Sequence, residues 1–209
     1  MSLRVIASEA DLAEGAAHLA SVCPVWARVL PQLGPLPLRR RADGFGALMS
    51  AIVSQQISTA AAASISARLA AAGLDRPQTI MAADDAALRA CGLSGQKVRY
   101  LRALAGAGID FDALRLMPDE EVSATLTALP GIGRWTAEMY LIFALGRADT
   151  FAPDDLALQE AARLMYGLAE RPKGRALAEL ARPWAPWRAV AARGLWAYYH
   201  AAKGREGVT

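Results

Sequence analysis

The sequence predicts an all-α protein, because apolar residues recur at helical spacing in nearly every segment. Proline, glycine and N-capping residues divide the chain into roughly a dozen helical stretches of ordinary length. Alternation typical of a half-buried strand is confined to a few residues near Val5, and nothing indicates a sheet. With 209 residues, 54% hydrophobic and 21% charged, the chain has the composition of a globular protein that buries a core as one domain or two small ones.

Local signals justify the helices of the first half. Pro24 separates two short helices, since proline has no N–H to donate and fits best in the first turn of a helix. The run Arg39–Arg41 belongs to a connector and is interpreted as a solvated linker rather than a DNA contact. Gly73 ends the second of two longer helices. These four helices are predicted at residues 12–20, 25–33, 45–55 and 58–72.

The second half is also helical. Ser94 is the predicted N-cap of one helix, because its hydroxyl can accept from an N–H of the first turn. Pro118 and three acidic residues begin another helix, whose N-terminus favours carboxylates. A further helix follows Asp154, and residues 175–203 are predicted to form two helices broken by two prolines.

Charge and composition exclude several classes of protein. The net charge is +3 and the basic residues are nearly all arginine, which suits phosphate but also follows genomic base composition, so nucleic acid is only weakly favoured. The two cysteines, Cys23 and Cys91, and the two histidines stand in no metal-ligand spacing. The N-terminus lacks a signal-peptide core, and the central apolar run Met139–Leu145 is too short to span a bilayer. We expect a cytoplasmic, nucleoid-associated protein with reduced cysteines.

Two neighbouring motifs carry the functional signal. The first, Leu129–Glu138, is typical of a helix, a tight glycine turn and a second helix, because alternate glycines permit a sharp turn and a close approach to a partner. The second helix presents unpaired N–H groups that suit a phosphate. About one helix length later, Phe151–Leu156 places Asp154 and Asp155 at the start of another helix. This order predicts a DNA contact followed by a catalytic carboxylate.

With these motifs the chain resembles the helix–hairpin–helix (HhH-GPD) DNA glycosylase superfamily, and within it the short bacterial and yeast-type 3-methyladenine DNA glycosylases. The resemblance runs from about Leu12 to Tyr199. Three blocks carry it: Phe45–Ser58, the Leu129–Glu138 hairpin with Pro153–Asp155, and Trp184–Tyr198.

The resemblance implies two helical subdomains with a DNA-binding cleft between them and the helix–hairpin–helix motif, at about residues 120–145, at that cleft. One subdomain is expected to be formed by both termini, residues 1–42 and 152–209. The other, residues 43–151, is expected to be a central helical barrel that carries the hairpin.

Similarity to the family places catalysis on Asp155 and a helix-capping role on Asp154. A methylated purine is already cationic and leaves easily, so an ionised carboxylate near the sugar can stabilise the charge that develops there. At about 4 Å and an effective dielectric near 20, such a pair contributes roughly 4 kcal/mol, or about three decades of rate. The same carboxylate is a candidate to guide the attacking water. The alternative is that both carboxylates only cap the helix after Pro153.

Three aromatic residues are candidates for the substrate pocket. Trp135 stands where strand-cutting members of the superfamily carry a Schiff-base lysine, and an indole forms no imine, so a monofunctional enzyme is expected. Trp135 over a cationic base would gain about 2 kcal/mol. Trp196 matches another pocket aromatic of the family. Tyr140 is a weaker candidate, and core packing is the favoured interpretation for it and for Trp26.

Further residues are candidates for DNA contacts through the resemblance. Gln55, Gln56 and Ile57 lie at a helix junction from which the family inserts a side chain into the minor groove beside the flipped nucleotide. Either Gln56 or Ile57 is this wedge, and a capped turn with a buried Ile57 is the alternative. Ser94 and Lys97 are candidates for the other strand, although a solvated helix start explains them almost equally well. The hairpin residues expected to hold a phosphate are Gly131, Gly133, Arg134 and Thr136.

The expected function is that of a monofunctional DNA glycosylase of base excision repair, which flips alkylated purines, chiefly 3-methyladenine, and hydrolyses the N-glycosidic bond. The expected partner is double-stranded DNA with alkylated bases, and the protein is expected to be a monomer. No metal or organic cofactor is expected in the chemistry, while the resemblance implies a structural monovalent cation at hairpin carbonyls. The alternatives are a glycosylase for oxidised or deaminated bases and a non-catalytic helix–hairpin–helix damage sensor.

Overall fold

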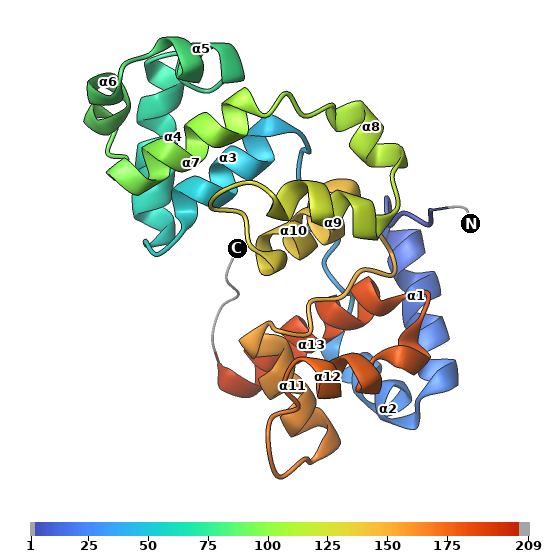
Figure 1. The fold of residues 1–209 in the computed structure, drawn as a ribbon. Helices are drawn as coiled ribbons and strands as arrows, with labels where there is room; N and C mark the ends of the chain where they lie inside the picture. The colour runs from blue at the N-terminus through green and yellow to red at the C-terminus, as the bar shows by residue number, and fades with distance from the viewer. Residues whose placement is uncertain (1–2, 205–209) are drawn as a thin grey trace. The chain divides into compact units, whose positions relative to one another are not determined.

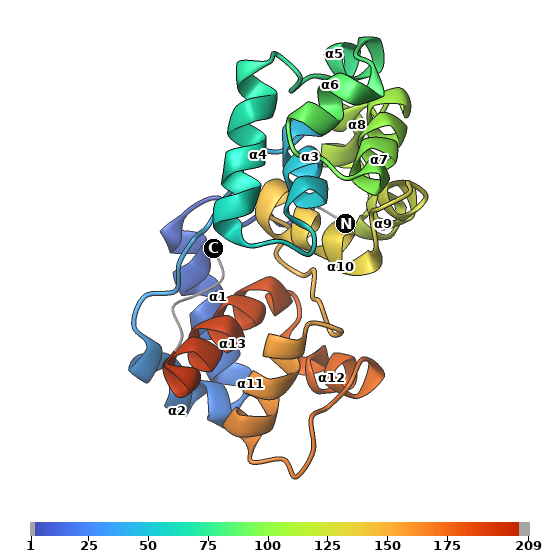
Figure 2. The same ribbon diagram turned by 90° about the vertical axis from the view of Figure 1, so that its left-hand side faces the viewer.

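The computed structural model describes residues 3–204, and within this range the protein is helical (Figures 1 and 2). Thirteen α-helices, one π-helical segment and one 3-10 helix are present, and residues 3–204 contain no β-strand. An isolated antiparallel bridge joins Val5 to Arg147, at the place where the sequence indicated a few extended residues. The all-α prediction is confirmed.

The chain divides into two compact units. One lies within Met1–Arg40 and Leu141–Thr209, and the other is the continuous segment Arg41–Tyr140. Residues 141–151, which the sequence analysis grouped with the central barrel, belong to the first unit. Backbone bonds explain this membership, because the N–H of Ile6 donates to the carbonyl of Gly146 at 2.7 Å. The expected cleft stays a prediction.

The first unit is organised around its last helix. α13 packs against α1, α2 and α11 (Figure 2). In the core of this unit, the buried rings of Trp26 and Trp184 pack edge to face with their centroids 5.5 Å apart. The ring of Phe151 packs on Trp184 in the same way, at 5.8 Å. The core interpretation of Trp26 is confirmed. The elements of this unit are α1 (Glu9–Val22), α2 (Pro24–Leu33), α11 (Leu156–Tyr166), α12 (Arg175–Leu180), the 3-10 helix (Arg182–Trp184) and α13 (Arg188–Lys203).

The second unit packs around α7, which contacts α3, α5 and α6. Ser94 is the N-cap of α7 as predicted, and its hydroxyl accepts from the N–H of Lys97. Leu88, Leu101 and Leu114, from three helices of this unit, are fully buried in its interior. Its helices are α3 (Phe45–Ser54), α4 (Thr59–Ala71), α5 (Pro77–Ala82), α6 (Asp85–Ala90), α7 (Gly95–Gly106), α8 (Phe111–Leu116), α9 (Asp119–Thr127) and α10 (Arg134–Met139).

A π-helical segment, Tyr140–Leu145, follows α10 directly and carries the chain from the second unit back to the first. π-turns inside helices are rare and occur often at functional sites, because the extra residue shifts the register of the side chains that follow. Phe143, which contributes to the site described below, lies in this segment.

Candidate active site and DNA interface

Asp155 begins α11 of the first unit as its N-cap. Its Oδ1 accepts from the backbone N–H groups of Ala157 and Leu158, at 2.9 and 3.0 Å. The indole Nε1–H of Trp196, on α13, donates to the same oxygen at 3.3 Å. Three donors therefore converge on one carboxylate oxygen, and the side chain is half-buried. Such donors fix the orientation of a carboxylate.

The N-cap prediction for Asp154 is wrong. Pro153 and Asp154 form the middle of a turn that is closed by a bond from the N–H of Asp155 to the carbonyl of Ala152, at 3.1 Å. Proline at the first central position favours such turns, so the helix begins one residue later than expected. Asp154 is exposed, and its Oδ1 lies beside Gly174.

The indole ring of Trp196 also packs against a second aromatic ring, that of Phe143. Its ring and that of Phe143 lie 5.4 Å apart between centroids, inclined by 31°. The sequence resemblance had placed Trp196 in the substrate pocket, and the structure brings it together with Asp155 as one arrangement within the first unit. The ring packing and the hydrogen bond together fix the orientation of the indole.

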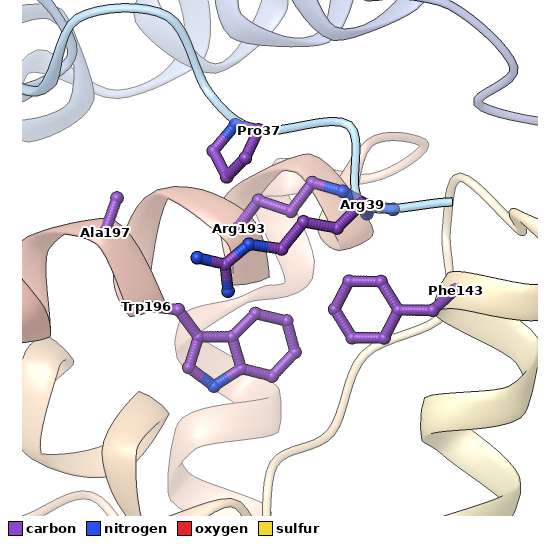
Figure 3. A pocket seen from close by; sticks show the side chains of 6 residues that line it. All are labelled: Pro37, Arg39, Phe143, Arg193, Trp196 and Ala197. Atoms are coloured by element: carbon purple, nitrogen blue, oxygen red, sulfur yellow. The ribbon is translucent and has the colours of Figure 1, made fainter. Parts of the chain in front are cut away.

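A small pocket opens beside this pair of rings (Figure 3). Two arginines, Arg39 and Arg193, contribute to its lining, and Figure 3 shows both side chains on one side of the two rings. Arg39 comes from the connector that the sequence analysis interpreted as a solvated linker, and its side chain is exposed. The complete lining is Pro37, Arg39, Phe143, Arg193, Trp196 and Ala197.

Arg193 and Phe143 are not among the site residues that the sequence predicts. Arg193 interrupts an otherwise apolar stretch of α13, Ala189–Leu195, and is 2% exposed. A lone arginine among small apolar residues is a signal for a buried cation with a particular partner, because charged side chains are rarely buried without one. No comparable signal marks Phe143 within its apolar run.

In the second unit, the hairpin between α9 and α10 has the sharp turn that its glycines predicted. Gly131 has φ +89°, and its backbone passes so close to Tyr100 that a Cβ would overlap the ring. Gly133 is the N-cap of α10, so the first N–H groups of that helix follow it as expected. Arg134 pairs with the buried carboxylate of Glu138 at 2.9 Å while remaining largely exposed, and Thr136 is half-buried.

The residues at the junction of α3 and α4 divide into one that faces inward and two that are exposed. Gln55 donates from Nε2 to the carbonyl of Gly131 at 2.7 Å, so it braces the hairpin. Gln56 adopts φ +58°, a conformation uncommon outside glycine, and is exposed. Ile57 is 36% exposed, so the burial of Ile57 in the alternative interpretation is wrong, although the turn is capped as that interpretation expected. Ser58 is the N-cap of α4.

Lys97 also points partly inward. Its Nζ donates to the carbonyl of Val53 at 2.6 Å, and burial lowers the pKa of the ammonium group. An ammonium carries three donors, so this bond does not exhaust its capacity for a phosphate. The hydroxyl of Ser94 accepts a hydrogen bond as the N-cap of α7, which agrees with the interpretation of Ser94 as a helix start rather than a DNA contact.

The two remaining aromatic candidates differ sharply in exposure. Trp135 lies in the first turn of α10 and is 50% exposed. Tyr140 is buried, and its hydroxyl accepts from the backbone N–H of Gly44 at 3.1 Å. Burial is the main cause that raises the pKa of Tyr140, so it stays neutral at physiological pH. This arrangement agrees with core packing for Tyr140 and leaves Trp135 as the accessible ring.

Within residues 3–204, no group of three or more His, Cys, Asp or Glu side chains is placed to hold a metal ion. No helix in this range is long and apolar enough to cross a membrane. The monovalent cation at hairpin carbonyls stays a prediction.

A protein-family model and several known proteins match this chain in sequence. A family model described as HhH-GPD superfamily base excision DNA repair protein matches residues 49–186. The alkylbase DNA glycosidase-like protein mag2 of Schizosaccharomyces pombe is 30% identical over 203 residues, which cover 91% of this chain and 95% of that protein. DNA-3-methyladenine glycosylase 1 of the same yeast is 30% identical over 198 residues, which cover 89% of this chain and 87% of that protein.

Solved structures are similar over nearly the whole chain. The Schizosaccharomyces pombe 3-methyladenine DNA glycosylase Mag1, in complex with abasic DNA, superposes with a TM-score of 0.73 at 28% identity, covering 91% of this chain and 97% of that chain. A DNA-3-methyladenine glycosidase of Bacillus halodurans superposes with a TM-score of 0.78 at 30% identity, covering 98% of this chain and 95% of that chain.

Proposed function

This chain belongs to the HhH-GPD superfamily of base excision DNA repair proteins, and we propose that it is a monofunctional glycosylase that releases alkylated purines, chiefly 3-methyladenine, from double-stranded DNA. It is a base excision repair DNA glycosylase of the 3-methyladenine glycosylase type. The observation that carries the proposal is the carboxylate of Asp155, which α11 and Trp196 hold by three hydrogen bonds to one oxygen. This carboxylate would act on the nucleotide that is flipped out of the duplex.

In the proposed reaction Asp155 stabilises positive charge on the deoxyribose. The bond between the sugar and the methylated purine breaks and its electron pair leaves with the base, which becomes neutral; water then adds to the sugar and releases one proton to solvent, which gives an abasic site. A cationic leaving group needs little acid assistance, so the ionised carboxylate supplies most of the help. Because its orientation is set before substrate binds, little reorganisation is required in the transition state. Asp155 therefore acts as a fixed negative charge and as a guide for the attacking water.

Trp135 supports both the proposed reaction type and the proposed substrate class. An indole cannot form the imine that strand cleavage by a lyase requires, so base release is the proposed end of the reaction. Half of the Trp135 side chain is accessible, as a ring that stacks on a base must be. The face of this indole attracts a cation, which favours methylated purines over neutral ones.

Replacing Trp135 by leucine is expected to reduce release of cationic bases, such as 3-methyladenine and 7-methylguanine, about thirtyfold more than release of the neutral base hypoxanthine. Leucine keeps apolar contact but has no aromatic face, and a desolvated cation–π contact contributes about 2 kcal/mol. Single-turnover rates on the three substrates measure the difference. Phenylalanine at the same position is the matched control and should restore part of the selectivity. Equal losses on all substrates would argue against recognition of charge.

For DNA contact we propose the hairpin and the α3–α4 junction. The first N–H groups of α10, after Gly133, would receive a backbone phosphate, with the exposed guanidinium of Arg134 beside them. Gln56 and Ile57 are the proposed wedge candidates, because both are exposed while Gln55 is bonded to the hairpin. An inserted side chain partly offsets the cost of unstacking the flipped nucleotide.

The direct test of the proposed function is to incubate the protein with methylated duplex DNA and to identify released bases by chromatography. The expected result is free 3-methyladenine and intact strands that break only after alkali treatment. Release of oxidised or deaminated bases alone would replace the substrate class. Binding without release of any base would favour a damage sensor, and strand breakage without alkali would overturn the monofunctional assignment.

A further inference from the structure

Arg193 is a buried cation in the first unit that the proposed chemistry does not use. Its guanidinium donates from Nη1 to the carbonyl of Ala189 at 2.9 Å and from Nη2 to that of Ile142 at 3.2 Å. Longer bonds of 3.4 Å run from Nε and Nη2 to the carbonyl of Leu38. One side chain thus joins α13, the π-helical segment and the connector after α2.

The position of these carbonyls in the chain is informative. Leu38 lies two residues before the first unit ends at Arg40, and Ile142 lies one residue after that unit resumes at Leu141. In a π-helical segment the usual spacing of backbone bonds is shifted, so a carbonyl such as that of Ile142 benefits from a side-chain donor. The planar fork of arginine can serve several acceptors at once, which a lysine ammonium does with less directional precision.

Stability alone does not account for an arginine here. Burial, aided by the positive charges of Arg39 and Arg40, lowers the pKa of Arg193 to about 10, which still leaves it charged at physiological pH. Taking a cation out of water is costly, and well-packed apolar side chains at such positions are often equally or more stable. The residue is therefore better explained by what it orients than by what it adds to the core.

A continuous series of contacts leads from Arg193 to the carboxylate. The guanidinium carbon lies 5.0 Å from the centroid of the Phe143 ring, and Phe143 directly follows the bonded Ile142. The Phe143 ring packs on Trp196, as Figure 3 shows. Trp196 in turn donates to Oδ1 of Asp155. Fixing the backbone of the π-helical segment fixes Phe143, and the aromatic contact then limits the tilt of the indole.

We infer that Arg193 is a positioning residue for base release. It sets the orientation of the Trp196 indole, and through it that of Asp155, by donating a hydrogen bond to the π-helical segment and by its cation–π contact with Phe143. The inference rests on the proposed role of Asp155, but its first step, from Arg193 to Trp196, concerns the free protein. Arg193 itself touches neither the base nor the sugar in this proposal.

The Arg193→Met variant tests the inference, because methionine is unbranched and apolar but donates no hydrogen bond. We expect its single-turnover rate of 3-methyladenine release at saturating enzyme to fall about tenfold, while the enzyme concentration for half-maximal rate stays unchanged. Trp196→Phe, which removes the indole donor, should cause a similar loss. In the double variant the two losses should not multiply, because both changes act on the same contact.

A spectroscopic readout separates this inference from the proposed function. In the free protein, the indole N–H resonance of Trp196, assigned by its absence in Trp196→Phe, should shift in Arg193→Met. The control is Arg182→Gln, which removes an exposed arginine paired with Glu179 in the same unit and should change neither the resonance nor the rate. If Asp155→Asn released bases normally, the proposed function would fail while the resonance still tested Arg193.

Two results would overturn the inference: an unshifted Trp196 resonance in Arg193→Met, or fully multiplicative losses in the double variant. If the methionine variant does not fold, Arg193→Lys takes its place. It keeps the charge but replaces the planar fork, so we expect a smaller shift of the resonance and a smaller loss in rate than in Arg193→Met. An unchanged spectrum and rate in the lysine variant would equally contradict the proposed positioning role of Arg193.

Discussion

Asp155→Asn is expected to lower the rate of base release by about three orders of magnitude while binding to DNA is retained. The amide keeps an oxygen that can accept from Ala157, Leu158 and Trp196, and asparagine caps helices about as well as aspartate. What the variant loses is the negative charge. At about 4 Å and an effective dielectric near 20, that charge contributes roughly 4 kcal/mol to the transition state.

Single-turnover release of base from methylated DNA measures the rate, and fluorescence anisotropy with a duplex that holds an abasic site measures binding. Asp154→Asn is the matched control: it makes the same chemical change one residue earlier, in an exposed turn, and should keep the wild-type rate. A variant at Asp155 with full activity, or a control at Asp154 with none, would transfer the catalytic role away from Asp155.

The second large effect concerns stability. Gly131→Ala should lower the free energy of unfolding by about 3 kcal/mol. A residue with a Cβ costs roughly 1–2 kcal/mol more than glycine at the positive φ found here, and overpacking adds about 1–3 kcal/mol. The new methyl would overlap the ring of Tyr100, so either the ring or the hairpin must shift. A shift of the hairpin would also disturb the bond that Gln55 donates to its carbonyl.

Chemical denaturation followed by circular dichroism measures this loss. Gly133→Ala is the control, because Gly133 has φ −87° and a Cβ there would meet nothing within 4 Å. Its free energy of unfolding should change by less than about 1 kcal/mol. Similar losses in the two variants would contradict the explanation from backbone conformation and contact with Tyr100.

The sequence was sufficient for features governed by local chemistry. Helical periodicity, the Ser94 cap and the tight turn at Gly131 each depend on neighbours in the chain, and the structure has them where they were predicted. The predicted N-cap of α11 was wrong by one residue, because Asp155 and not Asp154 caps this helix. Both aspartates can cap a helix, and only the backbone turn over Pro153 and Asp154 decides between them.

The contacts around Trp196 could not be predicted from the sequence, for a different reason. Phe143 is one of several apolar residues in a run, and the π-helical register of Tyr140–Leu145 changes which of them face the same way. Arg193 bonds to carbonyls more than fifty and one hundred and fifty residues away, at Ile142 and Leu38. Partners of a buried donor at such separations depend on the fold as a whole.

The division of the chain into units has a consequence for how the protein is made on the ribosome. Arg41–Tyr140 is one uninterrupted stretch, so it can finish folding while later residues are still being added. The helices α1 and α2 have no such option, because α13 packs against both of them, with Gly194 against the ring of Trp26, and is synthesised more than one hundred and fifty residues later. Until α13 has been synthesised, the apolar faces of α1 and α2 lack the helix that covers them, and such exposed faces are sites where a chaperone can bind a nascent chain.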